Sequence, residues 1–161
     1  MSKGFLLILI LSVFLTVNAW SSMVSIYVIE TGVPEEAVIY PHSELWENAF
    51  LDVFFEAGHI VTNDTTMRLD FKPTQDILDF INVESALNSG IEYVIIAQLD
   101  FNTDIMNPAE ISFFIYKLSS MEKIVEKKIQ GRLQSGLPQR TQREEFDYMK
   151  SIARGLSLKL R

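Results

Sequence analysis

The side chains of this chain that could perform acid–base or metal chemistry are few, and they lie far apart. None of the 161 residues is a cysteine, which excludes disulfides, thiolate nucleophiles and cysteine-ligated zinc. The two histidines, His42 and His59, lie beside opposite ends of one predicted helix, roughly 22 Å apart at a rise of about 1.5 Å per residue. They cannot share a metal ion and have no HxxxH or HExxH spacing, so we interpret both as surface or capping histidines.

Carboxylates form the second candidate site, because Asp100, Asp104 and Glu110 flank the turn after the most apolar segment. Carboxylates at the end of a strand can bind a cation, but 100–110 lacks the glycine and the closing glutamate of a calcium-binding loop. The nucleotide-binding motifs GxGxxG and GxxxxGK[ST] and the serine-hydrolase motif GxSxG do not occur. We therefore predict no catalytic residue, no metal and no cofactor, and interpret this turn as a solvated loop.

The amino-terminal residues have the pattern of a signal peptide. Lys3 precedes the apolar run 5–17, and Val17-Asn18-Ala19 places permitted residues at the −3 and −1 positions of a signal-peptidase site. The run is short for a bilayer span, which needs roughly 20 apolar residues. We predict a signal peptide over 1–19 and a single domain over 20–161, exported to the periplasm or secreted without stable membrane insertion. The alternative is an uncleaved membrane anchor.

Composition limits the partners of the exported domain. Without Lys3, 13 basic residues face 21 acidic ones, so the net charge is −8. A domain this acidic repels phosphate backbones and anionic lipid headgroups, so we predict that it does not bind nucleic acid. A small exported domain without disulfides must rely on its hydrophobic core, which favours a bacterial periplasm over a eukaryotic extracellular space.

Hydrophobic periodicity predicts the elements that must position these side chains. Strands are expected over 23–30, 60–69, 91–101, 110–118 and 123–130, and helices over 43–57, 74–87 and 141–160. The segment 91–101 is apolar on both faces and so is typical of a covered central strand. The order β-α-β-α-β-β-(β)-α predicts an α/β (α+β) domain with three helices packed on a mixed sheet of four to five strands.

The first predicted helix carries the candidate partner-binding residues. Trp46 and Phe50 share one face of the helix, whereas Phe55 lies about 180° from Phe50 at 100° per residue. If the Trp46 face packs on the sheet, Leu51 and Phe55 point towards solvent or a partner. Exposed aromatic side chains mark partner surfaces.

Two aromatic pairs, Phe54-Phe55 and Phe113-Phe114, cannot place both members on one face of their element. Either one member of each pair is exposed, or both faces of the sheet are covered. The first case favours a docking module for a protein partner. The rival function is a small-ligand carrier or an enzyme whose site lies at the loop end near Asp100 and Asp104.

The segments SELWENAFLDVFFEAGHIVTN and ALNSGIEYVIIAQLDF, with the strand entry Ser89-Gly90-Ile91-Glu92-Tyr93-Val94, resemble the small α/β domain of bacterial envelope accessory proteins. That group includes the curli secretion lipoprotein, the lipoprotein activators of penicillin-binding proteins and the amino-terminal domain of the Tol-system propeller protein. The resemblance implies a non-enzymatic domain that docks a protein partner in the periplasm. This chain lacks the lipobox cysteine, so the resemblance does not extend to a lipid tether.

The secreted form is expected to begin at Trp20, because Ala19 occupies the −1 position of the predicted cleavage site. Amino-terminal sequencing of the protein recovered from the cell envelope tests this. Recovery of intact Met1 in the membrane fraction would instead identify an uncleaved anchor.

Overall fold

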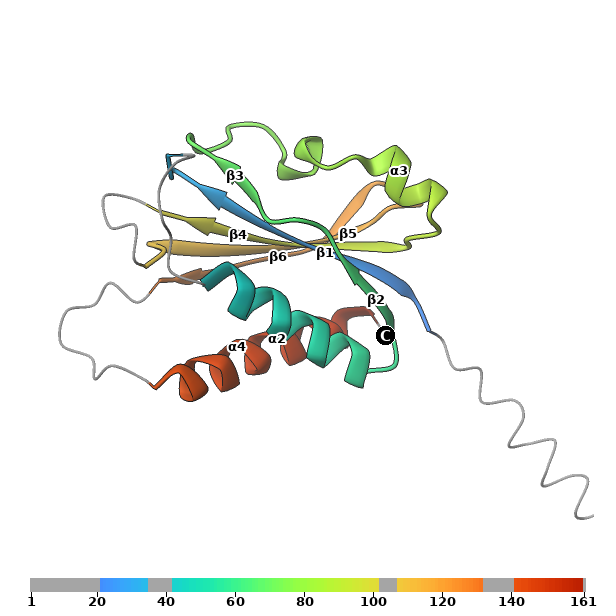
Figure 1. Cartoon of the computed structure of the whole chain (residues 1–161). Coiled ribbons are helices and arrows are strands. Elements are labelled where there is room, and N and C mark those ends of the chain that lie inside the picture. The colour runs from blue at the N-terminus through green and yellow to red at the C-terminus, as the bar shows by residue number, and fades with distance from the viewer. Residues whose placement is uncertain (1–20, 35–41, 102–106, 132–140, 161) are drawn as a thin grey trace, which may run out of the picture.

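The computed structural model describes residues 21–34, 42–101, 107–131 and 141–160 (Figure 1). The predicted signal peptide lies outside these residues. The strands are β1 (Met23–Thr31), β2 (Ile60–Asn63), β3 (Met67–Leu69), β4 (Tyr93–Asp100), β5 (Glu110–Lys117) and β6 (Glu122–Gln130). The helices are α2 (His42–Glu56), α3 (Val83–Asn88) and α4 (Gln142–Ser157), with short 3₁₀ turns η1 (Ile77–Phe80) and η2 (Leu158–Leu160). Within the described ranges, no helix is long and apolar enough to cross a membrane.

The strands form one mixed sheet in the order β2-β1-β4-β5-β6, with β3 also pairing with β1. Strand β1 runs parallel to β2, β3 and β4, whereas β5 and β6 add in antiparallel fashion. The predicted α/β class with three helices on a mixed sheet is confirmed. The described residues contain six strands rather than four to five because the predicted strand 60–69 breaks after Asn63, and its two halves pair separately with β1.

Helices α2 and α4 cover one face of this sheet, which we call the helical face (Figure 1). Its core combines apolar side chains of both helices with those of the central strands: Trp46, Phe50, Phe54, Met149, Leu156, Ile26, Ile95 and Phe113. The rings of Trp46 and Phe113 lie 5.0 Å apart. Each large apolar side chain buried in this way stabilises the fold by roughly 1.5–3 kcal/mol.

On the opposite face, which we call the groove face, the cover is incomplete. Side chains of η1 and α3 pack against the apolar part of the central strands, with a core that contains Ile77, Leu78, Ile81, Ala86, Ile96, Phe114 and Tyr116. Phe113 and Phe114 are both buried, so for this pair the alternative with both sheet faces covered is correct. Further along β4 and β5, the groove face carries polar residues instead.

The prediction of a single helix over 74–87 is wrong. The Asp76 side chain accepts the Leu78 N–H and starts η1, and the Asn82 side chain accepts the Ser85 N–H and starts α3. Ile81, between them, has extended backbone (φ −103°, ψ 139°), so two side-chain caps divide the segment into two short helices. Leu87, expected on the buried face, is 44% exposed.

The ends of the other two helices follow their capping residues. Thr141 and Glu144 form a capping box at the start of α4. Gly58 follows α2 with φ +90°, a conformation that glycine adopts readily after a helix. Ser43 lies inside α2, where its hydroxyl donates to the buried Glu30 carboxylate at the end of β1.

Ile95→Asp is expected to abolish folding, because Ile95 is fully buried in the middle of β4. An unpaired charge there costs several kcal/mol, comparable with the whole stability of a domain. Lys127→Asp, on the exposed part of β6, should change stability by less than about 0.5 kcal/mol. Circular dichroism and thermal melts of both variants test the assignment of β4, which fails if Ile95→Asp melts like the parent protein.

Candidate functional site

A polar groove of about 340 Å³ lies on the groove face, next to the part that η1 covers. One wall is the segment 72–77, and the floor comes from β4, β5 and β6. The main floor residues are Gln98, Ser112, Phe114 and Tyr116. Because side chains alternate along a strand, residues of equal parity on β4 and β5 reach this face together, and Gln98 lies directly opposite Ser112 in the register.

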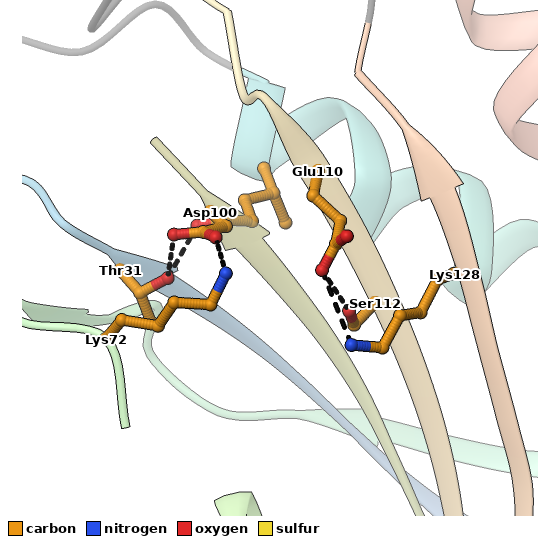
Figure 2. A network of polar contacts seen from close by, with 7 residues as sticks. Thr31, Lys72, Asp100, Glu110, Ser112 and Lys128 are labelled. Carbon is orange, nitrogen blue, oxygen red and sulfur yellow. Dashed lines mark hydrogen bonds and ion pairs between the residues drawn. The ribbon is translucent and has the colours of Figure 1, made fainter. Parts of the chain in front are cut away.

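Asp100, at the end of β4, is fixed by neighbouring side chains (Figure 2). Its carboxylate accepts a hydrogen bond from the Thr31 hydroxyl at 3.2 Å and forms an ion pair with Lys72. The hydrogen bond to Asp100 raises the pKa of the Lys72 ammonium above its ordinary value of 10.5. The prediction of a solvated loop is therefore wrong for Asp100, which is 7% exposed, while Asp104 lies outside the described residues.

Glu110 holds the corresponding position at the start of β5, directly opposite Asp100. Figure 2 shows Ser112 and Lys128, from β5 and β6, approaching the same oxygen of its carboxylate. The Lys128 Nζ lies 3.5 Å from Glu110 Oε1, and the Ser112 hydroxyl donates to the same oxygen at 3.5 Å. Two ion pairs thus lie side by side across the polar ends of three strands.

The other end of the groove contains a second set of paired polar groups. The Tyr116 hydroxyl donates to the Asp76 carboxylate. Burial disfavours the ionised form of this carboxylate, but the hydrogen bonds from Tyr116 and from the Leu78 N–H favour it, and the pKa of Asp76 is lowered. The Lys123 Nζ lies 2.7 Å from Glu126 Oε2. This hydrogen bond lowers the pKa of Glu126 and raises that of Lys123. The Lys123 ammonium also lies 5.4 Å from the centre of the Phe114 ring.

The charges that line the groove balance one another. Three lysines (72, 123 and 128) face three carboxylates (Asp76, Glu110 and Glu126), and each carboxylate already accepts a hydrogen bond or pairs with a cation. Among the described residues, no three histidine, aspartate or glutamate side chains gather in a way that could hold a metal ion. The lining therefore offers hydrogen-bond donors and acceptors whose charges are already paired.

The two histidines, predicted as surface or capping residues, do not lie at the surface. His42 and His59 are 5% and 7% exposed. The His42 Nδ1 lies 3.7 Å from the Glu145 carboxylate on α4, and the His59 ring lies 5.7 Å from that of Phe54. Both rings therefore help to attach α2 to its neighbours.

The predicted partner-binding residues differ in exposure. Phe55 is 74% exposed on the outer face of α2, whereas Phe54 beside it is fully buried. Leu51 is only partly exposed, because it packs against the edge of the core on the helical face. Phe55 is thus accessible as expected, and Leu51 offers only part of its surface.

Gln98 and Lys72 are residues of the groove that the sequence prediction missed. Gln98 interrupts the apolar segment 91–101, and a glutamine inside a covered strand was a usable sign of a polar site. Lys72 gave no such sign, because its partner Asp100 is 28 residues away in the sequence and meets it only in the folded sheet.

No protein-family model matches the chain, and no curated protein matches its sequence. Similar solved structures include TolB from Acinetobacter baumannii (11% identity, TM-score 0.44), the LpoB C-terminal domain from Salmonella enterica (14%, 0.42) and the lipoprotein GNA1162 from Neisseria meningitidis (9%, 0.46). The matches cover 87%, 74% and 87% of this chain, and 27%, 91% and 99% of those chains, so this chain spans about a quarter of TolB. These neighbours include members of groups that the sequence resembles, at TM-scores below 0.5.

Tyr116→Phe is expected to lower the free energy of unfolding by about 1 kcal/mol at pH 7, because it removes the hydrogen bond to the Asp76 carboxylate. The lowered pKa of Asp76 means that this stabilisation is present above the ordinary value of 3.8 and is lost as the pH falls through the lower folded value. The difference between variant and parent should therefore shrink in acid. Denaturant titrations at several pH values measure it.

Tyr93→Phe is the matched control, since no hydrogen bond of the Tyr93 hydroxyl is found within the described residues. Its stability should follow that of the parent at every pH. A difference for Tyr116→Phe that does not change with pH would contradict the role of the ionised Asp76.

Proposed function

We propose that this chain is a non-enzymatic module of the bacterial cell envelope, exported to the periplasm, that docks a protein partner through the outer face of α2. The observation that carries the proposal is the exposure of Phe55, at 74%, on a helix whose inner face is fully packed. Export rests on the signal-peptide pattern of 1–19, and the net charge of −8 carried by residues 20–161 disfavours nucleic acid and anionic lipid as partners.

Phe55 has the properties of an interface anchor. Aromatic side chains bury a large area at a small loss of conformational entropy and are enriched among the residues that dominate binding energy. The fold itself does not need this ring, because Phe50, Phe54 and Trp46 already fill the helical face beneath α2. An exposed phenylalanine that contributes little to the core is available to anchor a partner.

The charges around Phe55 indicate the chemistry of that partner. Helix α2 contains Glu44, Glu47, Asp52 and Glu56 and has no lysine or arginine. Asp52 and Glu56 lie near the C-terminal end of the helix, where the dipole disfavours negative charge, and Lys150 of α4 approaches both, at 3.3 and 3.6 Å. We therefore expect the partner to present a basic surface around an apolar pocket that receives Phe55.

Phe55→Ser is expected to leave the melting temperature nearly unchanged, because its cost should be far below the ~3–5 kcal/mol of losing a buried phenylalanine. The same variant should lose one defined crosslinked adduct when living cells are treated with a crosslinker. Phe71→Ser is the matched control, since Phe71 is 50% exposed on the segment between β3 and η1. This control should retain the adduct.

Charge reversal provides a second test of the same surface. Asp52→Lys combined with Glu56→Lys should weaken the adduct, and raised salt should weaken it in the parent protein. An adduct that survives in Phe55→Ser would show that the partner binds elsewhere. If no defined adduct forms in the parent, the docking proposal is wrong.

A further inference from the structure

We propose that the polar groove binds a neutral, hydroxyl-rich small molecule of the saccharide class. This site is separate from the docking surface, because the groove lies on the groove face of the sheet and α2 lies on the helical face. A volume of about 340 Å³ falls within the range of small-molecule pockets, roughly 300–1,000 Å³. The inference stands whether or not a protein docks on α2.

Gln98 is the residue that points to a ligand. It is 9% exposed, it lines the groove, and its carboxamide makes no hydrogen bond within the described residues. A carboxamide offers two donors and one acceptor. The amide atoms of Gln98 are not fully buried, so they are accessible from the groove. A molecule in the groove that both donates and accepts hydrogen bonds would pair with them.

The charge balance of the groove favours a neutral ligand. A charged ligand would have to break ion pairs such as Lys128–Glu110 or Lys123–Glu126, or leave its own charge uncompensated. A hydroxyl group has no such requirement, because it donates to the remaining lone pairs of a paired carboxylate and accepts from the remaining N–H groups of its lysine. Several hydroxyl groups on one small ring would use the groove's paired charges without separating them.

The groove also offers an apolar strip beside its polar groups. Phe114 and Ile77 line it together with the Ser112 and Tyr116 hydroxyls. A sugar ring presents hydroxyl groups at its rim and C–H groups on its faces. This combination of an apolar strip, a carboxamide without a hydrogen bond in the described residues, and balanced charges therefore suits a saccharide better than an amino acid or a phosphate ester.

The experiment is a titration of the ¹⁵N-labelled secreted protein with maltose and with N-acetylglucosamine, monitored by NMR. The Gln98 side-chain NH₂ signals should shift with saturation for at least one sugar. Glutamate and lysine, smaller zwitterions that also carry a net charge at pH 7, should shift them at least tenfold more weakly. Gln98→Leu should weaken sugar binding at least tenfold without lowering the melting temperature, because the removed carboxamide has no partner in the free protein.

Gln142→Leu is the control, since Gln142 is exposed at the start of α4, outside the residues that line the groove. It should bind sugar like the parent. Three results would overturn the proposal: no shift of the Gln98 signals with either sugar, tighter binding of the zwitterions, or unchanged sugar binding by Gln98→Leu. If Gln98→Leu does not fold, the titration of the parent protein decides alone.

Discussion

The structure depends on burying the three central strands β1, β4 and β5 on both faces at once. Ile95 and Ile96 are neighbours on β4, and each is fully buried in a different core, one under α2 and α4 and one under η1 and α3. The two covers are unequal. Helices α2 and α4, of 15 and 16 residues, extend along the strands, whereas η1 has four residues and α3 has six. Where the short cover ends, the strands can carry polar side chains without leaving them buried in an apolar core.

This inequality accounts for the position and the character of the groove. The side chains of β4 on the groove face change from Val94 and Ile96 to Gln98 and Asp100, and β5 changes in the same place from Phe114 to Ser112 and Glu110. Polar groups that are only partly solvated need partners, and Thr31, Lys72 and Lys128 supply them to the two carboxylates. Within the described residues the Gln98 carboxamide makes no hydrogen bond, so a ligand can bind it without breaking a contact between these residues.

Features that depend on local pattern could be predicted from the sequence, and features that depend on tertiary contacts could not. The segment 91–101 has apolar residues on both of its faces, and this pattern predicted a central strand that is covered on both sides. The division of 74–87 into η1 and α3 could not be predicted, because the apolar spacing of this segment fits a single helix. The side chains of Asp76 and Asn82 accept backbone N–H groups and start two separate short helices. Both histidines are buried because α4 and the ring of Phe54 cover them, and no local pattern encodes such contacts. For the candidate site, Asp100 was found but its partner Lys72 was not.

The registers of the sheet place the two proposed surfaces at opposite ends of the molecule as well as on opposite faces. Phe55 comes five residues before Ile60, which pairs with Met23 at the start of β1, whereas Gln98 pairs with Ile29 near the end of β1. Helix α2 connects the two ends: Ser43 contacts Glu30 at the end of β1, and Phe55 lies about 18 Å further along the helix at 1.5 Å per residue. A partner seated on Phe55 would therefore leave the groove open. Under the two proposals, one small domain holds a saccharide and a protein on surfaces that share no residue.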